Sequence, residues 1–189
     1  MTSNRTLLCS SVLLAPVLGC GGGTASNAPA SVTINCGASD EGWLAMQDLV
    51  NATGAHTDDV NAALLSAPAT GALLSAATPT TFQWTLSLPV AILAPHGIDN
   101  GTFVWLHFTG AGLTAPFDVI SVNPGKPDAD AGVLAPCLSY TPSAADWARL
   151  AGAAGTLTLS LYTAKESLNV VTEGPFQPTT NAFAFTVTP

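Results

Sequence analysis

The run His56-Thr57-Asp58-Asp59 gathers residue types that could do chemistry together. An imidazole beside two carboxylates suits a general base or a metal ligand set, so His56 with Asp58 or Asp59 could serve an unrecognised hydrolase. Histidine and aspartate in a polar helix-start segment are more often a solvated cap, in which the side chains accept backbone N–H groups. We keep the hydrolase as a hypothesis and favour the cap.

Asp128 and Asp130 form a second candidate, because alternate carboxylates followed by Gly132 resemble the opening of a calcium loop. The segment lacks the third acidic ligand and the distal glutamate of such loops. It follows Pro124-Gly125-Lys126-Pro127, which is typical of a loop between strands. Asp128 and Asp130 are therefore weak calcium candidates, and the sequence predicts no other metal site and no cofactor.

The remaining histidines have no partner that the sequence reveals. His96 precedes a glycine in a predicted loop, and His107 alternates with apolar residues on a predicted strand. The chain has no H-E-x-x-H, G-x-S-x-G or G-x-x-x-x-G-K motif and no nucleotide-binding glycine fingerprint. These absences lower the expectation of catalysis, and we predict that the protein is not an enzyme.

Four tryptophans could form a platform for a sugar, since aromatic faces bind carbohydrate at modest entropy cost. Trp84, Trp105 and Trp147 lie in regular apolar patterns, which favour burial in a core. The sequence leaves Trp43 as the exposed exception.

The N-terminal segment has the pattern of a secretory signal. Arg5 supplies a positive start, residues 7–18 are mainly apolar, and the small Gly19 precedes Cys20 as a cleavage site requires. The apolar run is interrupted by polar residues and is too short for a spanning helix, which needs roughly 20 apolar residues. Export is therefore the expected fate of the chain.

The quartet Val17-Leu18-Gly19-Cys20 resembles the processing site of bacterial lipoproteins. The resemblance implies that residues 1–19 are removed and that Cys20 becomes the lipidated N-terminus. Gly21 stands where an aspartate would favour retention at the inner membrane, so the implied destination is the outer membrane or the cell surface. Simple cleavage and secretion is the alternative.

Removal of the signal leaves few cysteines. Cys9 is lost, Cys20 is acylated, and only Cys36 and Cys137 remain as thiols in an oxidising compartment. Two cysteines can pair in one way, so we predict a Cys36–Cys137 disulfide. The alternative is two independent buried cysteines.

Charge is sparse and mostly negative. The formal net charge is −8, and Lys126, Arg149 and Lys165 are the only basic residues after Cys20. Nucleic-acid binding needs clustered Lys and Arg, so this class of partner is not expected. The expected partners are the membrane, through Cys20, and a protein or glycan of unknown identity.

Hydrophobic patterning is mostly that of short strands. Residues 82–88 alternate apolar and polar side chains, as a half-buried strand does. The turn Asp99-Asn100-Gly101 precedes a second strand at residues 102–108, and we expect these two strands to pair or to be neighbours. Five further strands, each bounded by Gly, Pro, Asn or Asp, are predicted at residues 117–122, 133–139, 156–163, 168–172 and 182–188.

Helical signals are confined to three short segments. Ser143 precedes Asp146 at the spacing of a capping box, and Trp147 and Leu150 then lie on one face of a short connecting helix. Residues 40–50 and residues 58–65 carry two more short helical patterns.

The chain thus divides into a signal peptide at residues 1–19, a Gly- and Ala-rich lipidated tether at residues 20–30, and one domain at residues 31–189. We expect residues 31–77 to form a partly helical N-terminal extension of that domain. Many short strands with frequent turn signals favour an antiparallel sandwich.

Several segments resemble bacterial immunoglobulin-like or fibronectin type III-like surface domains. They are Pro79–Trp84, Tyr140–Pro142 with Trp147–Leu150, Leu157–Leu161, Gly174-Pro175 and Phe183–Val187. The resemblance implies an all-β, antiparallel immunoglobulin-like β-sandwich of about seven strands with short helical connectors. The spacing of Cys36 and Cys137 departs from it, being about twice that of the inter-sheet bond of antibody domains.

The sequence therefore predicts a lipid-anchored, exported surface protein that acts as a non-catalytic structural or interaction module. A carbohydrate- or calcium-dependent ligand-binding module and an unrecognised hydrolase are the alternatives.

Overall fold

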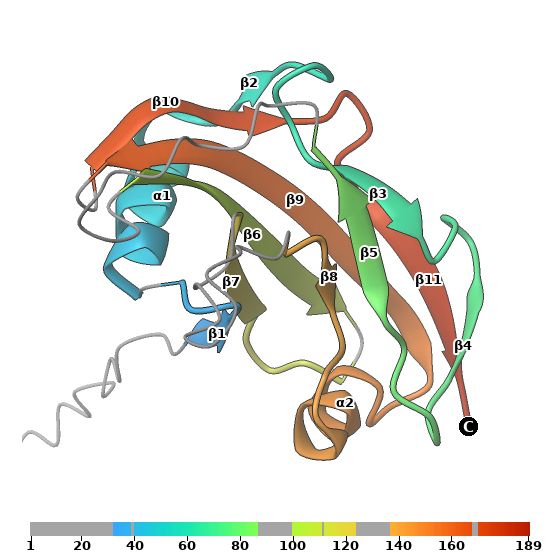
Figure 1. Cartoon of the computed structure of the whole chain (residues 1–189). Coiled ribbons are helices and arrows are strands. Elements are labelled where there is room, and N and C mark those ends of the chain that lie inside the picture. Colours follow the sequence, from blue (N-terminus) through green and yellow to red (C-terminus); the bar gives the residue numbers. More distant parts are fainter. Residues whose placement is uncertain (1–31, 39, 87–99, 111, 124–136, 168–169) are drawn as a thin grey trace, which may run out of the picture. The chain divides into compact units, whose positions relative to one another are not determined.

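The computed structural model describes residues 32–38, 40–86, 100–110, 112–123, 137–167 and 170–189 (Figure 1). Contacts divide the chain into residues 1–30 and residues 31–189, and all described residues belong to the second unit. The predicted signal peptide, tether and Cys20 lie outside the described residues, as do His96, Asp128 and Asp130.

Eleven strands and two helices make up the described part of the chain. In chain order they are β1 (Val32–Asn35), α1 (Asp40–Thr53), β2 (His56–Thr57), β3 (Leu64–Ala67), β4 (Leu73–Ser75), β5 (Phe82–Thr85), β6 (Asn100–Gly110), β7 (Phe117–Asn123), β8 (Ser139–Tyr140), α2 (Ala144–Leu150), β9 (Gly155–Ser167), β10 (Val170–Gln177) and β11 (Phe183–Thr188).

The larger sheet has eight strands and mixed pairing. Its main path runs β1-β7-β6-β9-β10-β2, and β11 joins β9 to β4. The central pairs β6–β7, β6–β9, β9–β10 and β9–β11 are antiparallel, whereas β1–β7, β2–β10 and β4–β11 are parallel. The expectation of a purely antiparallel fold is therefore wrong at these three outer pairings.

The smaller sheet is antiparallel, in the order β3-β5-β8 (Figure 1). We expected β5 and β6 to pair or to be neighbours, but they belong to different sheets. They face each other across the core, where the rings of Phe82 and Phe108 lie 5.0 Å apart, edge to face. Apolar alternation specifies which side of a strand is buried. It is satisfied equally when two strands pair within one sheet and when they face each other from two sheets.

The main core lies between the two sheets. Alternation is regular on β5, where Phe82 and Trp84 are buried while Gln83 and Thr85 are exposed. The other core residues include Val104, Leu106, Phe108, Val119, Leu157, Leu159, Leu161, Phe185 and Val187. The described structure is thus β-rich, with two sheets packed on one apolar interior.

A second core lies under α1, on the other face of the larger sheet. Trp43 and Met46 pack there with Phe103, Trp105 and Ile120. Trp43 is only 1% exposed, so the expectation that it is exposed is wrong. The apolar side of the 14-residue helix covers the sheet, which explains why β6 is buried on both faces from Phe103 to Leu106.

The helix α2 forms as predicted. Its N-cap is Ser143, whose hydroxyl accepts the backbone N–H of Asp146 at 3.1 Å. Trp147 and Leu150 are buried in the main core, and the indole N–H of Trp147 donates to the carbonyl of Ser75 at 3.1 Å.

Residues 58–65 are not helical, which corrects the third helix prediction. The Asp58 carboxylate accepts the backbone N–H groups of Val60 and Asn61 and so fixes a turn. The chain then enters β3, where Leu64 and Leu65 pair with β5. The described residues of the region 36–77 are therefore part of the packed domain, since they contribute α1, β2, β3 and β4.

Predictions for the other strands agree with the structure where residues are described. The strands at 117–122, 156–163 and 182–188 are β7, a longer β9 and β11. Of the strand predicted at 133–139, residues 133–136 lie outside the described residues and only Ser139 falls in β8. Of the strand predicted at 168–172, residues 168–169 lie outside the described residues, and the others belong to β10, which runs on to Gln177.

The predicted Cys36–Cys137 disulfide is confirmed. It joins the end of β1, in the larger sheet, to the segment just before β8, in the smaller one. Beside it, the Asn35 side-chain amide donates to the Ser121 hydroxyl at 2.8 Å and to the Ser139 carbonyl at 2.9 Å. Covalent and hydrogen bonds therefore tie the two sheets together at this edge.

Candidate functional site

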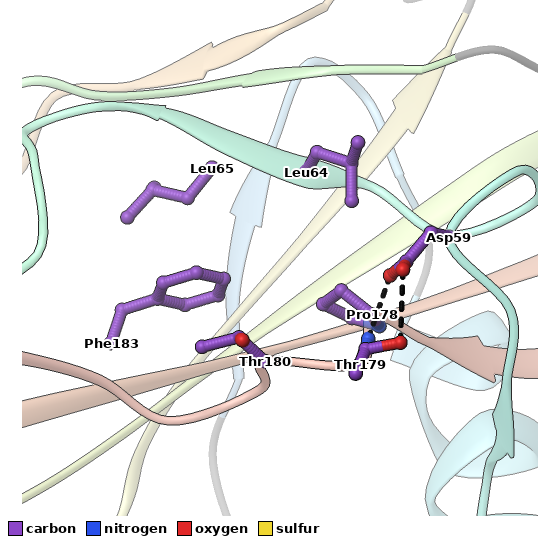
Figure 2. Close-up of a pocket in the computed structure, with 7 residues that line it drawn as sticks. All are labelled: Asp59, Leu64, Leu65, Pro178, Thr179, Thr180 and Phe183. Atoms are coloured by element: carbon purple, nitrogen blue, oxygen red, sulfur yellow. Dashed lines mark hydrogen bonds between the residues drawn. The ribbon is translucent and has the colours of Figure 1, made fainter.

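A cavity of about 320 Å³ opens between β3 and the connection from β10 to β11 (Figure 2). Its lining residues are Asp59, Leu64, Leu65, Pro178, Thr179, Thr180 and Phe183. The side chains of Leu65 and Phe183 face the same space, and Thr180 lies beside them. The walls are mainly apolar, with hydroxyl groups at one side.

Among the predicted chemical residues that the structure describes, Asp59 alone lines this cavity. Its two carboxylate oxygens accept the backbone N–H of Thr179 at 2.7 Å and the Thr179 hydroxyl at 2.9 Å (Figure 2). The carboxylate thus anchors the connection between β10 and β11 to the turn before β3. The cavity can hold a small apolar group. The Asp59 carboxylate at its edge already accepts two hydrogen bonds from Thr179.

The run His56–Asp59 does not form one site. His56 is exposed on β2, where it pairs with Phe176 of β10. The carboxylate of Asp58 serves its own turn, and the side-chain amide of Asn61, followed by the backbone N–H of Val60, lowers the pKa of Asp58. Asp58 therefore accepts backbone N–H groups, as the cap interpretation predicts, but it does so in a turn and not at the start of a helix.

The structure places a more organised set on the outer face of the larger sheet. His107 of β6 and Asp118 of β7 are direct partners across the strands, and His107 Nδ1 lies 2.7 Å from Asp118 Oδ1. The indole N–H of Trp105 donates to the same oxygen at 2.8 Å. Asp118 is 5% exposed and His107 is 26% exposed, so a buried carboxylate orients a partly accessible imidazole.

This geometry has a definite chemical consequence. If Nδ1 donates to the carboxylate, the lone pair of the neutral imidazole is on Nε2, where it can accept a proton or bind a metal. Tyr162 packs on Trp105 with ring centroids 4.7 Å apart, and burial raises the pKa of the Tyr162 hydroxyl. The sequence did not reveal this set because Asp118 reaches His107 only through the pairing of β6 with β7.

Replacement of Asp118 with alanine is expected to lower the free energy of unfolding by about 2–3 kcal/mol, because it leaves the buried Trp105 N–H without its acceptor and His107 without its carboxylate. Asp118→Asn is the matched control, since it keeps the shape and one oxygen acceptor and should cost less. Urea unfolding of both variants measures the difference. Equal losses would contradict this prediction, because they would show that the negative charge, rather than the shape and oxygen acceptor kept in Asp118→Asn, is what stabilises the fold.

Glu166 is a buried carboxyl group of a different kind. It is 2% exposed, lies on the α1 side of β9, and its two oxygens accept no hydrogen bond from the described residues. Burial raises the pKa of Glu166 to about 7. A Cβ atom placed on Gly42 of α1 would lie 2.7 Å from Glu166 Oε2, so the helix backbone sits directly on the carboxyl group.

The described residues contain no group of three or more His, Cys, Asp or Glu side chains that could hold a metal ion. The calcium prediction for Asp128 and Asp130 falls outside that part of the chain. All four tryptophans are buried, so they do not form an exposed platform for a sugar.

No family model, no curated protein and no solved structure matches the chain. Within the described ranges, neither helix has the length and apolarity needed to cross a bilayer.

Proposed function

We propose that the chain is an exported, lipid-anchored surface protein whose folded domain acts as a non-catalytic structural or interaction module. The signal-like N-terminus and the quartet ending at Cys20 support the anchor. A finer part of the proposal is that the domain is a variant of the immunoglobulin-like sandwich, with α1 added on one face and parallel strands at its margins.

The observation that carries the proposal is the Cys36–Cys137 disulfide. Disulfides form and persist in oxidising compartments outside the cytosol. With Cys9 in the signal and Cys20 acylated, the pair accounts for every other cysteine of the chain. Sequence and fold therefore favour the same compartment.

The arrangement of the remaining candidates supports a module without catalysis. His56, Asp58 and Asp59 do not converge on one site. Asp58 and Asp59 each hold a turn or connection through hydrogen bonds, and His56 is exposed. The surface is acidic and poor in charge, which suits a domain held at a membrane through its lipid rather than through basic side chains. Lipid with more than one acyl chain anchors stably.

Replacement of Cys20 with alanine tests the anchor. In a bacterial host with lipoprotein processing, the wild-type chain is expected in the membrane fraction and the variant in the soluble exported fraction or as unprocessed precursor, because the variant has no thiol to acylate. Cys9→Ala is the matched control and should fractionate as the wild type. Equal membrane association of the wild type and Cys20→Ala after an alkaline wash would contradict the proposal.

Hydrolysis is a second candidate function, and the His107–Asp118 pair is the observation that favours it. A carboxylate-oriented imidazole that acts as general base contributes about 10²- to 10⁴-fold in rate. His107→Gln is therefore expected to abolish any ester hydrolysis measured with a panel of nitrophenyl esters, while His56→Gln leaves it unchanged. A wild-type rate equal to that of buffer would remove this candidate.

A further inference from the structure

A second cavity, of about 290 Å³, lies between the end of α2 and the loop that joins β6 to β7. The position of α2 beside this loop is visible in Figure 1. Most of its lining residues are small, and one is cationic: Gly112, Leu113, Thr114, Ala115, Ala148, Arg149, Gly152 and Ala153. It is separate from the Asp59 cavity and from the His107–Asp118 pair, with which it shares no residue.

The two walls of this cavity touch through glycine. Gly112 has a φ of +91°, and a Cβ atom added to it would lie 2.8 Å from the Cβ of Ala153. A Cβ atom on Gly152 would lie 2.3 Å from the carbonyl oxygen of Ala148. Side chains at these two positions are therefore excluded by close contacts with the Ala153 side chain and the Ala148 carbonyl, so glycine allows the chain to approach this closely here.

Arg149 is held in a position suited to recognition. Its guanidinium carbon lies 4.7 Å from the centroid of the buried Phe117 ring, so the ring supports one face of the guanidinium. Asp146 is 3.9 Å from Arg149 Nη1, which is too long for a hydrogen bond, and its other oxygen accepts the Ser143 hydroxyl at 2.8 Å. In the described part of the chain no acceptor occupies the guanidinium fork.

Charge makes this position distinctive on an acidic protein. Lys165 is the other described cation after the signal, and its ammonium is engaged by Glu173 at 2.6 Å. Among the described carboxylates, Arg149 has only the long contact of 3.9 Å with Asp146, and its side chain is 58% exposed. A planar fork with five N–H donors matches a carboxylate through two parallel hydrogen bonds.

We propose that the cavity at Arg149 binds the carboxylate of a small ligand about the size of one hexuronic acid. The single guanidinium, with Asp146 3.9 Å away, balances the charge of one carboxylate but not that of a doubly charged phosphate. The volume is at the low end for small-molecule sites, which span about 300–1,000 Å³, so one sugar-sized group fills it. Thr114 is the other lining residue with a polar side chain. This binding does not depend on the proposed lipid anchor.

The test is a titration of the full mature chain with D-glucuronate, followed by amide and guanidinium NMR shifts. D-Glucose is the matched probe without the carboxylate. Saturable shifts at Gly112, Thr114 and Ala153 are expected with glucuronate and absent with glucose. Arg149→Met keeps an apolar stem over Phe117 but removes the fork, and it should weaken binding at least tenfold; Arg149→Lys keeps the charge and should weaken it several-fold.

Three results would overturn the proposal. They are equal shifts with glucose, unchanged affinity in a folded Arg149→Met variant, and the absence of any saturable shift with glucuronate. Inorganic phosphate that competes as strongly as glucuronate would overturn the assignment to a carboxylate. The thermal unfolding midpoint of each variant is compared with that of the wild type to check that the fold is retained. We expect little change in this midpoint, because Arg149 lies at the surface.

Discussion

Loss of the Cys36–Cys137 disulfide is expected to lower the free energy of unfolding by about 4 kcal/mol. The bond spans 101 residues of sequence. Chain-entropy arguments assign about 4.7 kcal/mol to a closed loop of roughly 100 residues, and measured losses for native bonds are typically about 2–5 kcal/mol. The bond also joins the two sheets, so its removal releases β1 and the segment before β8 from each other.

Urea unfolding measures this effect. The midpoint of a Cys36→Ala/Cys137→Ala double variant is expected to lie well below that of the oxidised wild type. The reduced wild type is the matched control, and it should unfold close to the double variant. A wild-type midpoint that does not move when dithiothreitol is added would show that the bond contributes nothing to stability.

The stability of the domain is expected to fall by about 3 kcal/mol as the pH rises from 4.5 to about 7, through the ionisation of Glu166. Burial raises the pKa of Glu166 in the folded state to about 7, whereas the ordinary value is 4.5. Between these two values the folded state holds one more proton than the unfolded state, so folding is favoured at the acidic end. Above the folded-state pKa, the cost of a buried carboxylate under α1 is complete.

Glu166→Gln isolates this group, because the amide has the same shape and does not titrate. The difference in unfolding free energy between the variant and the wild type should be small near pH 4.5 and should increase in favour of the variant up to pH 8. Glu173→Gln is the matched control, since that carboxylate is exposed and paired with Lys165. A difference that does not change with pH would contradict the inference about Glu166.

Local patterns in the sequence were sufficient where one strand or cap determines its own structure. The alternation of Phe82 and Trp84 with polar residues predicted β5, and Ser143 with Trp147 and Leu150 predicted α2 with its cap. The cysteine pairing followed from the small number of cysteines that the predicted loss of residues 1–19 would leave. In these cases the structure is determined by a few neighbouring residues or by the number of cysteines.

Pairing between distant strands could not be predicted in this way. Period-two alternation says which face of a strand is buried but not which strand lies beside it, so β5 and β6 were expected in one sheet. The parallel strands β1, β2 and β4 are only two to four residues long and carry little pattern. The pattern of residues 40–50 alone does not show that this helix packs on a second face of the larger sheet, so it could not predict the burial of Trp43.

The same limit applies to the sites. His56 and Asp59 are close in sequence, and their residue types suggested a common site. In the structure the Asp59 carboxylate instead accepts a hydrogen bond from Thr179, 120 residues away. His107 and Asp118 are 11 residues apart and meet only because β6 and β7 pair in one particular register. Arg149 is favourable for binding because Phe117 lies under it, which no local motif indicates.

The most direct test of the proposed function is the mass of the N-terminal peptide of the protein isolated from bacterial membranes. We predict that this peptide begins at Cys20 and carries a thioether-linked diacylglycerol together with an amide-linked acyl chain. A peptide that begins at Met1, or one cleaved elsewhere with an unmodified Cys20, would contradict it.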